Sequence, residues 1–368
     1  MRRPSLDLLR GTAAIAVAIP HLILVTRPNN PVLEGVAILG VEVFFVLSGY
    51  VLAPQILLCF RNLSQIPTFL ARRWLRTIPP YVLALVCATF VVGELGTADF
   101  YRYLVYCQNF FKQSNLVDYY PVAWSLSVEE WFYIIFPAVL LIARPFVSPS
   151  AKNLVLLGLA FILIITVIRQ SLGDSSHWGS DVRRVVLFRV DAIAYGVILR
   201  ALNVRVNRTH AVLLPFIAAA ALSADLWVIG TRATLHWLFS PLAAAFGISL
   251  ILLAENFDKR ITSSSLLSSA SFYLGRISYS LYLFHAIFAA LLIDRMMALP
   301  ASMRIALVLA ATISYCTVFY EFFEKPILAA RPSYQPEPGR CTAVASGQHQ
   351  EVEATRPLAS DNWALQRD

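Results

Sequence analysis

The sequence predicts an all-α protein, a polytopic membrane helix bundle of about ten transmembrane helices with both termini in the cytoplasm. Composition is the first reason: 58% of the 368 residues are hydrophobic and 14% are charged, against roughly 45–50% and about 25% in soluble domains. The second reason is that apolar runs of about 20 residues, the length that crosses a bilayer, recur along the chain. The third is that Lys and Arg gather in alternate loops. Together these features exclude a disordered chain and argue against an ordinary soluble enzyme.

Ten apolar stretches supply the predicted spans. They centre on residues 9–27, 35–58, 77–97, 122–143, 153–170, 184–202, 210–229, 233–254, 276–297 and 304–324. The first stretch contains Asp7, Arg10 and His21, and a second apolar stretch follows almost at once, so we expect a retained span and not a cleaved signal peptide.

The basic residues set the expected orientation. With the N-terminus inside, about two thirds of the Lys and Arg residues fall in cytoplasmic loops, as the positive-inside rule requires. The net charge of +8 then follows from topology, and no nucleic-acid partner is expected. Residues 1–329 are predicted to form one membrane domain. The polar residues 330–368 are predicted to form a disordered cytoplasmic tail.

Ionisable side chains within the apolar runs are candidates for function, because they are costly at membrane depth. Arg10 and His21 are eleven residues apart, so they share a helix face about 16 Å apart along the axis. The simpler interpretation is an arginine at the headgroups and a histidine bonded to a neighbouring helix. Glu42 is either half of a structural pair or a site residue. Arg73 and Arg76, three residues apart, form either a topological anchor or a fork for phosphates.

Further polar residues open or interrupt later spans. Glu129 and Glu130 lie near the start of the fourth span and point about 100° apart on a helix, so only one can easily face a given cavity. Arg189 and Asp191, two apart in the sixth span, cannot pair with each other on one helix and need partners elsewhere. His285 is a second imidazole in an apolar run, for which an interhelical hydrogen bond is the simple account.

No metal-ligand cluster is visible, because the five cysteines are scattered and form no CxxC pair.

Taken in order, these segments resemble the acyltransferase-3 family of integral membrane acyltransferases. Arg10 and His21 are similar to the family's Arg-x10-His signature, and Arg73-Trp74-Leu75-Arg76 is similar to its Arg-x-x-Arg motif. The blocks at 40–50, 124–130 and 278–285 resemble three further motifs, with Glu42 where the family often has Asp. The resemblance covers roughly residues 5–327.

The resemblance implies transfer of an acyl group, most often acetyl, from coenzyme A inside to a hydroxyl of a carbohydrate or glycolipid outside. It implies a bacterial inner (plasma) membrane location, acetyl-CoA or another acyl-CoA as donor, and no metal. Residues 1–329 would then be the acyltransferase domain. The chain is similar to short family members, without a fused hydrolase-like domain, that modify lipo-chitooligosaccharide nodulation factors, surface polysaccharides or macrolide sugars.

Within that interpretation, His21 is the expected general base, since imidazole titrates near working pH. Arg73 and Arg76 would hold the donor's phosphates and Arg10 would guide it, while Glu129 or Glu130 would orient the acceptor. Substrate-binding or structural polar roles are expected for Glu42, Trp124, Ser125, Arg189, Asp191 and His285. Direct transfer and a transient acyl-histidine both fit. The alternative is a secondary transporter or a flippase for a lipid-linked sugar, which also uses intramembrane charges.

Overall fold

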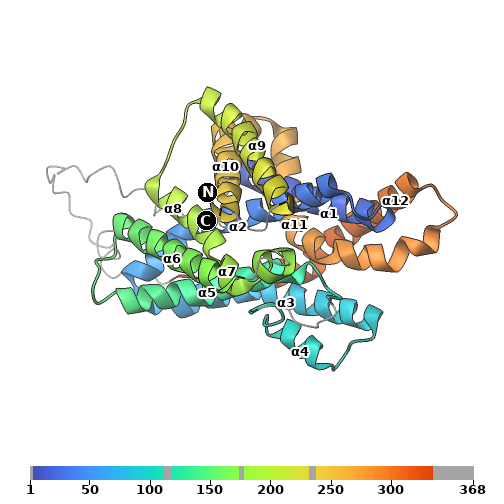
Figure 1. Ribbon diagram of the computed structural model, residues 1–368, viewed down its shortest axis with the longest axis horizontal. Coiled ribbons are helices and arrows are strands. Elements are labelled where there is room, and N and C mark those ends of the chain that lie inside the picture. The colour runs from blue at the N-terminus through green and yellow to red at the C-terminus, as the bar shows by residue number, and fades with distance from the viewer. Residues whose placement is uncertain (1–2, 112–117, 174–177, 232–237, 335–368) are drawn as a thin grey trace, which may run out of the picture.

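The computed structural model describes residues 3–111, 118–173, 178–231 and 238–334, and every regular element within these ranges is helical (Figure 1). Within the same ranges, nine helices are long and apolar enough to cross a membrane. They are α1 (Pro4–Thr26), α2 (Pro31–Arg61), α3 (Ile66–Val92), α5 (Ala123–Ala143), α6 (Ala151–Leu172), α9 (Arg208–Thr231), α10 (Phe239–Ser263), α11 (Ser265–Leu292) and α12 (Ala301–Phe319) with its continuation to Ala329. The predicted all-α membrane bundle is confirmed. The side of the membrane on which each terminus lies stays a prediction, and the predicted tail lies outside the described residues from 335 onward.

The predicted span at 184–202 differs from the other nine. It consists of three consecutive short pieces, α7 (Val186–Arg189), η3 (Val190–Ile193) and α8 (Ala194–Leu202). The backbone leaves the helical region at Arg189, with φ −127° and ψ −5°. The break has a physical reason, because Arg189 and Asp191 are held by different partners and a regular helix would not aim both correctly.

The third span begins earlier than predicted. A one-turn helix, η1 (Leu63–Gln65), leads directly into α3 at Ile66, although the predicted third span covers residues 77–97. Arg73 and Arg76 therefore lie on a helix, three residues apart. Their charge does not end the helix because both side chains line cavities inside the bundle.

Local sequence sets the helix ends. Pro31 occupies the first turn of α2, and the Asn30 side chain accepts hydrogen bonds from the Val32 and Leu33 amides. Gly93 follows α3 in a left-handed conformation (φ 83°), which glycine adopts without strain. The connection between α1 and α2 is only residues 27–30, and the two helices pack against each other as antiparallel neighbours.

The centre of the bundle is α1, which packs against α2, α10, α11 and α12. In Figure 1, α9 runs beside α10 and α12 runs beside α11. The closest approach joins α2 to α8, where a Cβ on Gly49 would meet the Ile193 carbonyl oxygen at 1.9 Å. A Cβ on Gly196 would meet the Val46 carbonyl oxygen at the same 1.9 Å. Small residues thus let these two backbones touch, as in many membrane helix pairs.

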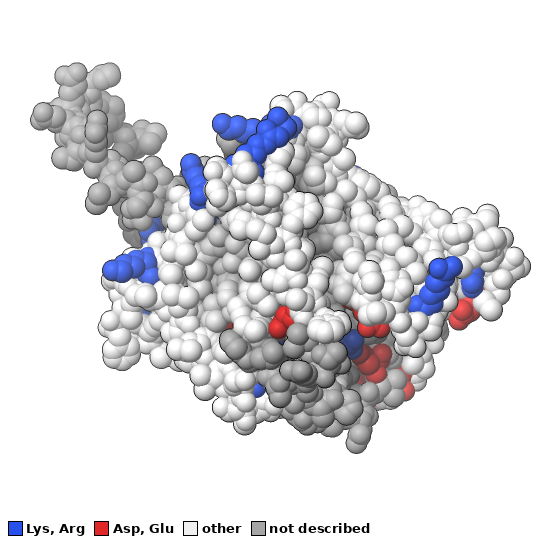
Figure 2. Space-filling view, turned by 45° about the horizontal axis from the view of Figure 1, so that its top comes forward, with Lys and Arg blue, Asp and Glu red and all other residues white. Residues whose placement is uncertain are grey.

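The outer surface of the bundle is apolar. Figure 2 shows broad areas without charge, with basic side chains gathered at the margins of the face in view. On α6 alone, six large hydrophobic side chains are exposed: Leu156, Leu159, Leu163, Ile164, Val167 and Leu172. An apolar exterior of this extent is what a lipid-facing surface requires.

Candidate active site

Three cavities lie in line along α1 and α11. Their order follows from α1, which places Arg3 and Arg10 at the first cavity, Arg10 at the second, and His21 at the third. On α11, Arg276 lines the first, Tyr279 the second, and Tyr282 both the second and the third. The first and third cavities therefore sit at opposite ends of the same two helices.

The first cavity, here called the basic cavity, has a volume of about 320 Å³ and collects arginines from four helices and from the chain after α13 (Lys325–Ala329). These are Arg3, Arg10, Arg76, Arg200, Arg276 and Arg331. The carboxylates of Asp7 and Glu324 also line it, and Arg10 lies 3.5 Å from Asp7. Arg3 also pairs with Glu255, and Arg276 pairs with Glu321. Six guanidinium groups thus face four carboxylates, and the remaining positive charge suits an anionic ligand.

The second cavity, the central cavity, has a volume of about 80 Å³ and brings together three predicted donor-binding residues, Arg10, Arg73 and Arg76. Glu129 faces them from α5 and accepts hydrogen bonds from Ser48 Oγ at 2.6 Å and from the Tyr133 hydroxyl. The two adjacent acids point in different directions, since Glu130 is buried and is not part of this wall.

The third cavity, the aromatic cavity, has a volume of about 860 Å³ and contains His21. Aromatic side chains form much of its wall: Tyr119, Tyr120, Trp124, Trp178 and Tyr282. Two adjacent arginines, Arg183 and Arg184, also line it. Arg183 closes η2 (Gly179–Arg183), the single turn before α7.

His21 and His285 form a direct pair between α1 and α11. Nδ1 of His21 lies 2.9 Å from Nε2 of His285, and the two rings are stacked with 5.2 Å between centroids. Nδ1 of His285 lies 3.0 Å from the Leu281 carbonyl oxygen. His285 is fully buried, and in the described part of the chain no carboxylate contacts it.

This geometry fixes the tautomers. A carbonyl oxygen only accepts, so His285 Nδ1 carries the proton and donates to Leu281. In a neutral imidazole the other nitrogen is then an acceptor, so His285 Nε2 accepts a hydrogen bond from His21 Nδ1–H. His21 Nε2 is left with its lone pair free, on a ring that lines the aromatic cavity. The arrangement presents a proton acceptor to whatever occupies that cavity.

Tyr282 and Ser125 stand between the central and aromatic cavities. Their hydroxyl oxygens are 2.6 Å apart, and the Tyr282 hydroxyl also lies 3.2 Å from the Val122 carbonyl oxygen. The Tyr282 ring packs edge-on against His285, with 6.0 Å between centroids. Ser125 lines the central cavity and its neighbour Trp124 lines the aromatic one, so this part of α5 forms the partition.

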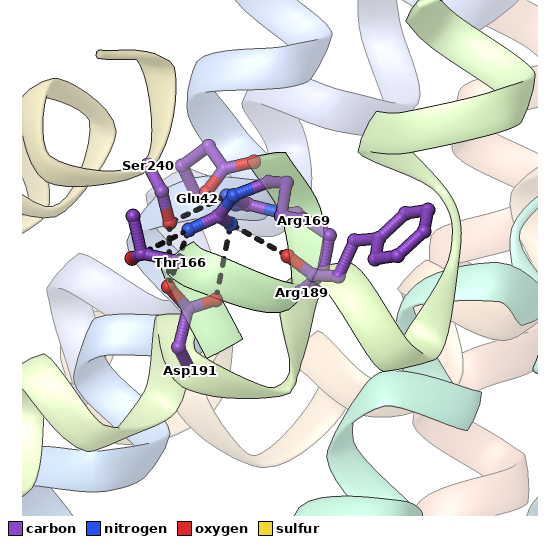
Figure 3. A network of polar contacts seen from close by, with 7 residues as sticks. Glu42, Thr166, Arg169, Arg189, Asp191 and Ser240 are labelled. Carbon is purple, nitrogen blue, oxygen red and sulfur yellow. Dashed lines mark hydrogen bonds and ion pairs between the residues drawn. The ribbon is translucent and has the colours of Figure 1, made fainter. Parts of the chain in front are cut away.

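Glu42, Arg189 and Asp191 belong to a separate, buried network (Figure 3). Arg189 pairs with Glu42 and donates to Ser240 Oγ at 2.8 Å. Asp191 pairs with Arg169 at 2.9 Å and accepts from Ser240 at 3.2 Å. None of these groups lines the three cavities. The network joins α2, α6, α7, η3 and α10 and holds the broken segment in place.

Sequence reasoning missed two arginines of this part of the structure. Arg169 is fully buried, and its only signal was a charge in the last turn of an apolar run. Arg183 lies in a connection that looked like a loop, beside a second arginine. Among the described residues no group of three or more His, Cys, Asp or Glu side chains could hold a metal ion.

These features are those of a multi-span membrane protein with polar chemistry enclosed between its helices. The chain belongs to the acyltransferase-3 family, whose model, described as an acyltransferase domain, matches residues 3–321. It is 28% identical over 309 residues to the O-acetyltransferase OatA of Staphylococcus aureus (strain NCTC 8325 / PS 47), covering 77% of this chain and 50% of that protein.

It is also 29% identical over 357 residues to the peptidoglycan O-acetyltransferase OatA of Listeria monocytogenes, covering 88% of this chain and 55% of the relative. The chain thus spans about half the length of the curated relatives it matches. No solved structure gives a significant match to it.

Proposed function

We propose that this protein is a membrane O-acetyltransferase that moves an acetyl group from acetyl-CoA at the cytoplasmic face to a hydroxyl of an extracytoplasmic carbohydrate or glycolipid. The observation that carries the proposal is the free lone pair of His21 Nε2 in the aromatic cavity, held by His285. Family membership supports acyl transfer, and the names of the relatives support an acetyl group and an oxygen acceptor.

The donor is assigned to the basic and central cavities. The phosphates of acetyl-CoA carry several negative charges, and six arginines line the basic cavity. Arg73 and Arg76 project from one face of α3 and, with Arg10, form forks suited to phosphate oxygens. Since coenzyme A is a cytoplasmic molecule, the basic cavity is assigned to the cytoplasmic face of an inner (plasma) membrane. The thioester arm then extends along α1 through the central cavity toward His21.

The reaction follows from the assigned tautomers. The acceptor hydroxyl donates its proton to His21 Nε2 as its oxygen attacks the thioester carbonyl carbon. The new carbon–oxygen bond forms, the carbon–sulfur bond breaks, and the proton passes from His21 to the departing thiolate to give coenzyme A. His285 Nε2 keeps its hydrogen bond from His21 Nδ1–H throughout and stabilises the imidazolium. Direct transfer requires no covalent enzyme intermediate, which agrees with a base already aimed at the acceptor's cavity.

The acceptor is assigned to the aromatic cavity. Its volume of about 860 Å³ falls in the usual range for small-molecule sites, roughly 300–1,000 Å³. The indoles of Trp124 and Trp178 offer flat apolar faces on which sugar rings pack. Glu129 lies with the arginines of the central cavity, so its position favours holding the donor-side arginines over the acceptor contact expected from sequence. Glu130 is assigned to packing.

The relatives suggest a first acceptor to test. The Listeria protein is named a peptidoglycan O-acetyltransferase, so cell-wall glycan is the first candidate. Surface polysaccharides, lipo-chitooligosaccharide nodulation factors and macrolide sugars are the other candidates.

The decisive experiment compares cells that carry the gene, lack it, or carry His21→Ala. Mass spectrometry of their surface and secreted glycoconjugates should show one extra acetyl group per modified sugar only with the unaltered protein. Purified protein in vesicles should form the same ester from isotopically labelled acetyl-CoA. A secondary transporter or flippase would move its substrate across the vesicle with no labelled ester, and that result would replace the present proposal.

A further inference from the structure

Arg183 is a buried arginine in the wall of the aromatic cavity. Its side chain is 8% exposed and lines the aromatic cavity together with His21. The guanidinium carbon lies 4.9 Å from the ring centroid of Trp124 and 5.8 Å from that of Trp178. Within the described ranges it forms no ion pair, and its buried Nε has no hydrogen-bond partner. Glu42 attracts Arg183 electrostatically but forms its ion pair with Arg189. Burial of the Arg183 guanidinium against two indoles is therefore costly unless a ligand completes its contacts.

The adjacent arginine, Arg184, differs from Arg183 in having a carboxylate partner. Arg184 lines the same cavity and is neutralised by Asp118, with 2.9 Å between Nη1 and Oδ2. The two carboxylates in the cavity wall, Glu34 and Asp294, are on exposed positions. Burial lowers the pKa of Arg183 to about 9, which leaves it charged at neutral pH. Among the described residues that line this cavity, Arg183 is thus a buried cation with no carboxylate in ion-pair contact.

We infer that Arg183 binds a carboxylate on the acceptor, so that the natural acceptors are acidic sugars. This inference rests on the proposed function, since it names the substrate class of the aromatic cavity. One guanidinium matches one carboxylate in charge and in its two parallel N–H donors. The indoles on either side would pack against the sugar ring that carries the acid. A phosphate monoester has up to two charges and would call for a second free cation, which Arg184 does not supply.

Binding to the purified protein tests the inference without any chemistry. Three tetrasaccharides serve as probes, identical except for a terminal glucuronic acid, glucose or glucose 6-phosphate. Isothermal titration in detergent should show the glucuronate probe binding about tenfold or more tighter than the glucose probe, as a charged hydrogen-bonded pair implies. Arg183→Gln should remove that difference, and Arg183→Lys should keep part of it. Arg304→Gln, an arginine outside the cavity, should bind all three probes as the unaltered protein does.

Two results would overturn the inference. One is equal binding of the glucuronate and glucose probes, or a preference that persists in Arg183→Gln protein that elutes as a folded species. The other is tighter binding of the phosphate probe, which would replace the carboxylate by a phosphate. Acetyl transfer is measured separately on the same samples. Carboxylate-dependent binding without transfer would contradict the proposed function alone, and transfer without carboxylate-dependent binding would contradict this inference alone.

Discussion

The basic and aromatic cavities lie at opposite ends of α1 and α11, yet their walls are built from different chemistry. The basic cavity has about 320 Å³ and six arginines, while the aromatic cavity has about 860 Å³ and a wall rich in tyrosine and tryptophan. Arginine side chains select ligands that have matching negative charge and a matching arrangement of acceptor oxygens. Aromatic faces select ligands mainly by shape, so they can bind many related ligands.

This contrast suggests a division of labour between a fixed donor and an adaptable acceptor site. In the proposed function, the donor end would bind acetyl-CoA, whose phosphates are constant, so a rigid charged site would be sufficient. The acceptor end would bind a sugar within a larger glycan, and its size and aromatic wall suit that task. Tyr282 and Ser125, which stand between the two, mark where the donor's thioester would meet the acceptor's hydroxyl. Variants that affect one end only can test whether the division holds.

The largest expected effect comes from His21→Ala. Loss of a general base costs about 100- to 10,000-fold in rate, so acetyl transfer should fall by that factor while binding of acetyl-CoA stays unchanged. Transfer is measured with labelled acetyl-CoA and binding by titration. His210→Ala is the matched control, since His210 is exposed and bonds only to Asn207 among the described residues. Full activity of His21→Ala would contradict the assignment of His21 as the general base in the aromatic cavity.

The next largest effect is expected from a variant of the buried polar network, which should weaken binding at both the basic and the aromatic cavity. Arg189→Leu breaks the buried pair with Glu42 and leaves a carboxylate without its partner, which costs about 3–5 kcal/mol of stability. Denaturation in detergent should show the loss, and binding at both cavities should weaken together. Arg102→Leu removes a surface pair with Asp99, whose arginine is 52% exposed, and should cost at most about 1 kcal/mol. Equal effects of the two variants would contradict a structural role for the buried pair.

A smaller effect should follow from His285, again at the acceptor end only. His285→Leu removes the acceptor that holds His21 in one tautomer, so we expect transfer to fall about 10- to 100-fold. His285→Gln offers a side-chain oxygen to the same His21 Nδ1–H and should recover part of the rate. Acetyl-CoA binding should not change in either variant. If His285→Gln and His285→Leu lowered the transfer rate equally, control of the His21 tautomer would not explain the role of His285.

The smallest effect is predicted at the donor end. Replacing Arg73 and Arg76 by lysine keeps the charge but loses the fork, so the KM for acetyl-CoA should rise about tenfold with little change in kcat. Arg72→Lys is the control on the same helix, because Arg72 donates to the Pro332 carbonyl oxygen at 2.7 Å and lines none of the three cavities. A fall in kcat with unchanged KM would move these arginines from binding to chemistry.

Much of the fold could be predicted from the sequence, because a membrane span is encoded locally by length and apolarity. The segment 184–202 was the exception. Its apolar composition is that of a span, but its conformation depends on Glu42 and Arg169, which come from two other helices. The start of α3 was misjudged for a related reason. Arg73 and Arg76 were interpreted as residues of a cytoplasmic connection because they are charged, although both line cavities inside the bundle.

The candidate site was predictable in part. The family motifs and the spacing of Arg10 and His21 on one helix could be read directly, and both residues line cavities in the predicted order. The contact between His21 and His285 could not be read, because it joins residues 264 apart through the packing of α1 on α11. The role of Arg183 could not be predicted either, since it depends on the absence of an ion pair to this residue in the described structure.

The close backbone packing at Gly49 and Gly196 bears on how this protein could acquire new acceptors. Neither position admits a side chain without pushing α2 and α8 apart, so a change there alters the frame on which all three cavities rest. The apolar wall of the aromatic cavity, including Ile38, Val91 and Ala290, carries no such constraint. Laboratory evolution of that wall, with Gly49 and Gly196 unchanged, should be able to change which glycan binds without changing the packing of the helices.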